Sequence, residues 1–140
     1  MAVRRFDDVT AGETFGPTTV HVGRDTLVAY AKASGDQNPI HQDEDFARSV
    51  GLPDVIAHGM WTMGAAGAVL EEWVGDGGRV VEFGTRFTSM VVVPRDGADL
   101  EVSGTVKSLD EESRRATVEL TVTAEGTKAL GRCLAVVALA

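Results

Sequence analysis

The stretch Gly59-Met-Trp-Thr-Met-Gly-Ala-Ala-Gly-Ala-Val-Leu-Glu-Glu-Trp-Val74 decides the fold, because it is apolar on nearly every side until Glu71 and Glu72. A helix that is hydrophobic all round is a buried helix. The glycines and alanines from Gly64 to Ala68 lower its helix propensity but let neighbouring backbone approach closely. We therefore expect one buried central helix with the rest of the chain wrapped tightly around it.

The residues that follow this helix change to a period of two. Apolar and polar residues alternate over 100–107 and 117–123, which is the pattern of half-buried strands, and 110–113 is a suitable hairpin loop between them. Two further strands are predicted over 80–93 and 128–139. Four consecutive strands imply an antiparallel sheet, so the expected fold class is α+β, with a curved sheet around the central helix. The exposed edges of such a sheet favour a dimer.

The residues before the central helix predict one extended segment and two shorter helices. Phe15–Val22 is extended, and the apolar spacing after it is typical of a helix that begins near Asp25 and ends at Gly35. The second helix presents Phe46, Ala47 and Val50 on one face and ends at Gly51. No linker or repeat interrupts the chain, so we expect a single domain over 1–140.

Composition excludes several classes of function. Thirteen Lys and Arg residues stand against 21 Asp and Glu residues, and the resulting net charge of −8 repels a phosphate backbone, so nucleic acid is not an expected partner. The longest apolar stretch, 59–70, is too short to span a bilayer, and residues 1–8 lack the apolar core of a secretion signal. A cytoplasmic protein without a membrane anchor is expected. The single cysteine, Cys133, excludes an intramolecular disulfide.

The polar loop Ser34-Gly-Asp-Gln-Asn-Pro-Ile-His41 is the segment most suited to chemistry. Pro39 excludes a continuous helix, so a turn can bring the Asp36 carboxylate and the His41 imidazole to one cavity. There, with Asn38, they could hold and activate a water molecule. The alternative interpretation is purely structural: Asp36 and Asn38 form an Asx-type turn, Pro39 stiffens it, and His41 caps the next helix.

The stretch from Tyr30 to His41, followed after five residues by Ala47, resembles the signature of the MaoC-like (R)-specific enoyl hydratase family. The later Ile56-Ala-His-Gly-Met60 resembles the segment that opens the central helix of that family. Within the family the chain is most similar to the B subunits of actinobacterial (3R)-hydroxyacyl-ACP dehydratases. The resemblance covers nearly the whole chain and implies a hotdog fold, in which the sheet wraps the helix and the subunits form dimers.

The resemblance also implies an activity, the reversible syn loss of water from a (3R)-3-hydroxyacyl thioester. Asp36 and His41 would form the catalytic acid/base pair. The sequence does not determine which of them transfers which proton. Asn38 would orient the water or the loop, and the backbone N–H of Gly59 would bind the thioester carbonyl as enolate charge develops. The reaction needs no cofactor.

The sequence does not determine which thioester carrier the protein uses or which subunit it pairs with. The leading hypothesis is the catalytic subunit of a fatty-acid elongation dehydratase that acts on acyl-carrier-protein (ACP) thioesters, as a homodimer or beside a related hotdog subunit that supplies part of the acyl pocket. The second is a homodimeric (R)-specific enoyl-CoA hydratase. A hotdog thioesterase and a non-catalytic subunit that binds acyl chains are hypotheses of other classes, and the presence of both Asp36 and His41 argues against the latter.

Other residues with reactive side chains receive structural interpretations. We expect His58, beside the helix start, to be a hydrogen-bonded structural residue and His21 to be a surface or partner contact. The three histidines show no ligand spacing, so no metal site is predicted. Cys133 lies in a predicted strand and is assigned to the core. The glycines of 75–78 are interpreted as the exit from the central helix, not as a phosphate loop.

Overall fold

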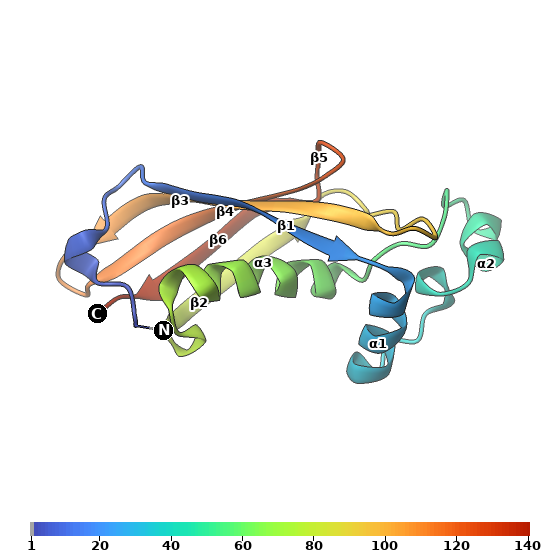
Figure 1. The fold of residues 1–140 in the computed structure, drawn as a ribbon, viewed down its shortest axis with the longest axis horizontal. Helices are drawn as coiled ribbons and strands as arrows, with labels where there is room; N and C mark the ends of the chain where they lie inside the picture. Colours follow the sequence, from blue (N-terminus) through green and yellow to red (C-terminus); the bar gives the residue numbers. More distant parts are fainter. Residues whose placement is uncertain (1) are drawn as a thin grey trace.

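A computed structural model describes residues 2–140 and contains one antiparallel sheet that curves over a central helix (Figure 1). The sheet has the strand order β1-β3-β4-β6-β2. These strands are β1 (Thr14–Val22), β2 (Val80–Phe87), β3 (Ala98–Asp110), β4 (Arg115–Ala124) and β6 (Leu130–Ala138), and the two-residue β5 (Thr127–Lys128) pairs with β4. The hairpin predicted at 110–113 joins β3 to β4, whose register begins with Asp110 opposite Arg115.

The helices lie on one side of this sheet and at one end of it (Figure 1). The central helix α3 (Gly59–Val74) runs along the sheet, whereas α1 (Arg24–Ser34) and α2 (Glu44–Ser49) lie beyond its N-terminal end. Short 3-10 turns complete the set: η1 (Phe6–Asp8), η2 (Pro39–His41) and η3 (Gly77–Arg79). Gly35 and Gly75 end α1 and α3 in the left-handed region, at φ 81° and 95°, which glycine reaches without a steric penalty.

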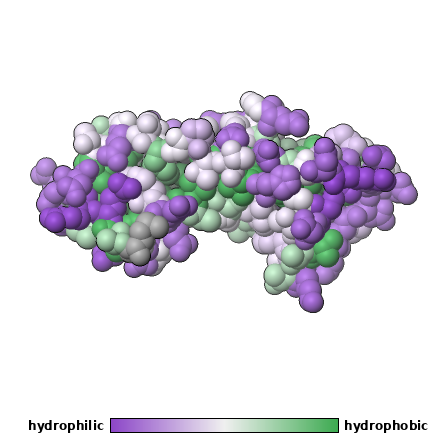
Figure 2. Space-filling view, viewed as in Figure 1, coloured by the Kyte–Doolittle hydropathy of each residue, from purple (hydrophilic) through white to green (hydrophobic). Residues whose placement is uncertain are grey.

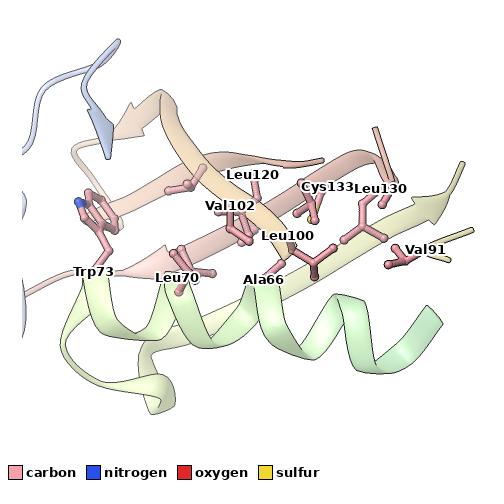
Figure 3. Close-up of a cluster of buried hydrophobic side chains, with 14 of the residues drawn as sticks. Ala66, Leu70, Trp73, Val91, Leu100, Val102, Leu120, Leu130 and Cys133 are labelled. Atoms are coloured by element: carbon pink, nitrogen blue, oxygen red, sulfur yellow. The ribbon is translucent and has the colours of Figure 1, made fainter. Parts of the chain in front are cut away.

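The core lies between α3 and the concave face of the sheet. Ala66, Leu70 and Trp73 point from the helix toward the strands (Figure 3). They meet the inward residues of β3, β4 and β6, which are Leu100, Val102, Leu120, Leu130 and Cys133. Each fully buried leucine contributes about 2 kcal/mol of hydrophobic stabilisation. Cys133 is 1% exposed, in keeping with its assignment to the core.

One side of α3 is open in this chain, contrary to the expectation of a helix buried all round. Thr62 and Ala66 are buried against the sheet, but Met60, Gly64 and Ala68 are exposed at a spacing of four residues. A sheet of five long strands curves along the helix and covers only one of its sides. Figure 2 shows strongly hydrophilic residues gathered at the two ends of the molecule and paler, more hydrophobic ones along its middle.

Two strand predictions overran the observed strands. The strand expected over 80–93 ends at Phe87, because the backbone of Thr88 turns and donates to the carbonyl of Ala129. Residues 88–93 then pair with the segment before α3 through Ala57 N–H to Val91 O and Val93 N–H to Val55 O. The same turn interrupts the strand expected over 128–139, so that β6 begins at Leu130. The departure of 88–93 from the sheet opens space beside the start of α3.

None of the helices within residues 2–140 combines the length and the apolar character that crossing a bilayer would require.

Candidate active site

The loop between α1 and α2 is folded by its own polar side chains. The backbone N–H of Asp36 donates to Ser34 Oγ at 3.1 Å, that of Asn38 donates to Asp36 Oδ1 at 3.1 Å, and that of Ile40 donates to Asn38 Oδ1 at 3.2 Å. The first is a serine turn, the next two are Asx turns, and Pro39 begins the turn η2. The Asx turns of the structural interpretation are therefore present, but Asp43, not His41, caps the next helix by accepting from the Phe46 N–H.

The loop brings Asp36 and His41 to the same place. His41 is 6% exposed, and its Nδ1 lies 2.7 Å from the carbonyl oxygen of Ile56. A carbonyl only accepts, so Nδ1 carries a proton, and in the neutral form of the ring Nε2 has the lone pair. Nε2 lies 3.9 Å from Asp36 Oδ2, and the Asp36 side chain is half exposed. A base and a carboxylate at this separation can bind one water between them.

Asn38 supports this loop with its side-chain oxygen, which accepts from Ile40. Of the two roles predicted for Asn38, orientation of the loop agrees with this hydrogen bond. The side chain of Asn38 is exposed, and it is not among the residues that line the pocket beside His41.

That pocket has a volume of about 260 Å³ and extends from His41 along the start of α3. Its lining is mainly apolar and includes Ile56, Thr62, Phe87, Met90, Val91 and Leu130. Gly59 also lines it as the first residue of α3, whose N-terminus has no side-chain cap. The first N–H groups of a helix have no partner within it, and they favour negative charge. The Gly59 N–H is therefore available to an oxygen atom in the pocket.

His58 contacts both members of the candidate pair. It is 2% exposed, its ring stacks on His41 with centroids 3.7 Å apart, and its Nε2 lies 3.2 Å from the Asp36 carbonyl oxygen. Burial lowers the pKa of His58, while the hydrogen bond to the Asp36 carbonyl opposes that shift. The expected hydrogen bond is present, but its location against Asp36 and His41 was not predicted. The sequence signal was the place of His58 in Ile56-Ala-His-Gly-Met60, just before the apolar stretch 59–70.

Asp36, His41 and His58 each offer a potential ligand atom, and these atoms lie within 4.8 Å of one another. The two imidazole planes differ by only 22°, so their lone pairs run in nearly parallel planes instead of converging on one point. His41 Nδ1 and His58 Nε2 are also directed at carbonyl oxygens. This arrangement does not fit a metal ion, whose ligands must converge.

An ion-pair cluster behind the loop fixes the flanking helices. Arg24 of α1 donates to Glu44 at 3.0 Å, to Asp54 at 2.9 Å and to the Val93 carbonyl at 2.8 Å. Arg95 adds two hydrogen bonds to Glu44, at 2.7 and 2.9 Å. Hydrogen bonds from Arg95 and Arg24 lower the pKa of Glu44 to about 2. The cluster thus ties α1 and α2 to the segments that flank the pocket.

The other singled-out residues lie outside the site. His21 forms an exposed contact with Asp99 at 2.7 Å, so it is a surface residue of β1 as expected. Gly75 ends α3, in agreement with the interpretation of 75–78 as a helix exit. Cys133 faces the core, and burial raises the pKa of its thiol. It has none of the properties of an activated nucleophile.

The chain is similar to known proteins over most of its length. The family model of the MaoC like domain matches residues 8–128. The chain belongs to the MaoC-like family. A MaoC-like dehydratase of known structure is 40% identical, with a TM-score of 0.97 over 99% of this chain and 43% of that chain. The (R)-hydratase from A. caviae involved in PHA biosynthesis is 25% identical, with a TM-score of 0.84 over 94% of this chain and 98% of that one. The predicted hotdog fold is confirmed.

Curated relatives of this MaoC-like chain differ in size. The 3-hydroxybutyryl-CoA dehydratase of Methylorubrum extorquens is 33% identical over 122 residues, which are 86% of this chain and 75% of that protein. The fatty acid synthase beta subunit TOXC of Cochliobolus carbonum is 38% identical over 89 residues, which are 62% of this chain. The match spans only 4% of that subunit.

Proposed function

We propose that the chain catalyses the reversible addition of water to a trans-2-enoyl thioester, which yields a (3R)-3-hydroxyacyl thioester. The observation that carries this proposal is the position of His41 Nε2, which lies 3.9 Å from the Asp36 carboxylate beside a largely apolar pocket. An acyl chain suits such a lining, and the hydration step needs a base and a second proton-transfer group on one face of the substrate.

In the hydration direction, a water held between Asp36 and His41 forms its bond to C3 and gives one proton to the pair. The pair delivers a proton to C2 on the same face, so both groups return to their starting state. Electron density moves onto the thioester oxygen as the C3–O bond forms and returns when C2 is protonated. The Gly59 N–H at the helix N-terminus stabilises that oxygen in between.

The proposed carrier is acyl carrier protein, in fatty-acid elongation, with coenzyme A as the alternative. Matches to fatty acid synthase beta subunits support the first, and the similarity to a 3-hydroxybutyryl-CoA dehydratase supports the second. We also propose a second hotdog subunit, identical or related. β2 is an edge strand, and Val81 and Phe87 on it are 44% and 54% exposed, so a partner would cover apolar side chains and pair the edge.

The test is hydration of a trans-2-enoyl-CoA, followed by loss of enoyl absorbance. Asp36→Asn and His41→Ala should each lower kcat by about 10²–10⁴-fold, the usual contribution of one acid or base group. His21→Ala, a change at an exposed histidine outside the pocket, is the matched control and should keep full activity. The same assay with the acyl-ACP substrate compares the carriers.

Two outcomes would refute the assignment. If the folded wild-type chain were inactive on both carriers even with a related hotdog subunit added, the catalytic interpretation would fail in favour of a subunit that only binds acyl chains. If free acid were released without hydration, the chain would be a thioesterase.

A further inference from the structure

His58 closes the site from behind, away from the solvent. Its ring lies between the rings of two residues from other segments: it stacks on His41 with centroids 3.7 Å apart, and it meets Tyr30 of α1 edge-on at 4.8 Å. The titratable side chains that face it include His41, Tyr30 and Asp36, and the backbone carbonyl of Asp36 accepts a hydrogen bond from its Nε2. A single imidazole therefore contacts both residues of the proposed acid/base pair.

The hydrogen bonds of the two rings define opposite tautomers. His58 Nε2 lies 3.2 Å from the Asp36 carbonyl oxygen, which only accepts, so Nε2 carries the proton. Burial lowers the pKa of His58 and so favours the neutral ring. Nδ1 then holds the lone pair, and it is the buried side-chain atom without a hydrogen-bond partner among the described residues. His41 has the reverse arrangement, with its proton on Nδ1.

Packing alone does not explain a histidine here. A phenylalanine ring could also stack on His41 beside Tyr30, and it would leave no buried nitrogen without a partner. What a phenylalanine lacks is the N–H that reaches the Asp36 carbonyl. This hydrogen bond fixes the peptide that carries the Asp36 side chain, while the stacked ring limits the orientations of His41.

We propose that His58 is a positioning residue, whose Nε2–H holds Asp36 and whose ring holds His41 at the separation that the water-activating pair requires. This inference rests on the proposed hydratase function and deepens it. The residue acts only through Asp36 and His41. Its removal should therefore lower kcat and leave substrate binding nearly unchanged.

The experiment compares His58→Gln with His58→Asn in the enoyl-thioester hydration assay. A glutamine amide nitrogen reaches the place of Nε2, whereas an asparagine amide reaches only the place of Nδ1. His58→Gln keeps the hydrogen bond to Asp36 and loses only the stack on His41, so it should retain kcat within about fivefold. His58→Asn loses both contacts and should lose about 10–100-fold, because misplacement of a catalytic group by about 1 Å costs about 10²-fold. KM should stay within about twofold for both variants. Equal kcat values for Gln and Asn would overturn the proposal.

A second measurement on the wild-type protein separates this inference from the proposed function. Nitrogen NMR of ¹⁵N-histidine-labelled protein at neutral pH reports the tautomer of each ring without any turnover. We expect a neutral His58 with its proton on Nε2. A His58 cation or the Nδ1–H tautomer would refute the proposal even if both variants failed to fold. If the wild-type protein has no hydratase activity but shows the expected His58 tautomer, the proposed function is refuted and the hydrogen-bond geometry at His58 is not.

Discussion

Replacement of Gly59 by alanine tests the proposed contact between the start of α3 and the thioester carbonyl. The added Cβ would lie 3.0 Å from Cδ1 and Cε1 of the Phe87 ring, which is closer than ordinary van der Waals contact. Phe87 is 54% exposed, so its ring can turn aside at a cost of about 0.5–1.5 kcal/mol in rotamer strain. Alanine gains up to about 1 kcal/mol over glycine in helix propensity. The two effects nearly cancel, so the free energy of unfolding should change by less than about 1 kcal/mol.

Activity should respond far more strongly than stability. The new methyl group and the displaced Phe87 ring both occupy the pocket beside His41, where the substrate carbonyl would approach the Gly59 N–H. Displacement of the reacting group by about 1 Å lowers kcat/KM by about 10²-fold. Enoyl-thioester hydration and chemical denaturation measure the two quantities separately.

Gly64→Ala is the matched control in the same helix. A Cβ added at Gly64 would have no other atom within 4 Å, so this change should raise stability by up to about 1 kcal/mol and leave activity unaltered. The reasoning about Gly59 is refuted if Gly59→Ala keeps kcat/KM within about threefold of the wild type. It is also refuted if Gly64→Ala loses as much activity as Gly59→Ala.

Two further predictions concern stability. Arg132 lies in β6 with φ 46°, a left-handed conformation in which a side chain is strained. Arg132→Gly should therefore raise the free energy of unfolding, measured in urea, by about 0.5–1 kcal/mol. A decrease would contradict this prediction. Arg95 and Arg24 lower the pKa of Glu44 from its ordinary 4.5 to about 2. The carboxylate therefore stabilises the fold fully above pH 4.5 and loses this contribution as the pH falls toward 2. Glu44→Gln should be less stable at neutral pH and should lose less stability between pH 4.5 and 2, and identical acid denaturation curves would refute the argument.

Much of the fold was predictable because local rules and tertiary packing agree. Gly35 ends the helix located by apolar spacing, Gly75 ends the helix located by its continuous apolar run, and the alternating pattern of β3 and β4 identifies their buried faces. Pro39 breaks the helical path and allows the Asp36 and His41 side chains to meet, as the sequence indicated. Their catalytic roles remain a prediction.

The rest depends on contacts between segments far apart in the sequence. Residues 88–93 have the composition of a strand, but backbone hydrogen bonds with 55–57 take them out of the sheet. The stack of His58 on His41 exists because residues 56–58 pass beside the loop, an approach that no local pattern describes. The sequence did not predict the open side of α3. Apolar residues all round a helix show that each side can be covered, but not whether this chain or a second subunit covers it.

Ile56 joins the two halves of the site by its backbone. Its N–H donates to the Ile40 carbonyl at 3.2 Å, and its carbonyl accepts from His41 Nδ1 at 2.7 Å. The loop cannot swing away from the start of α3 unless both bonds break together, so the loop and the helix start form one cooperative unit in local unfolding. The loop 34–41, although it lies between two helices and has an exposed polar surface, should therefore exchange its protected amide hydrogens together with those of 56–57.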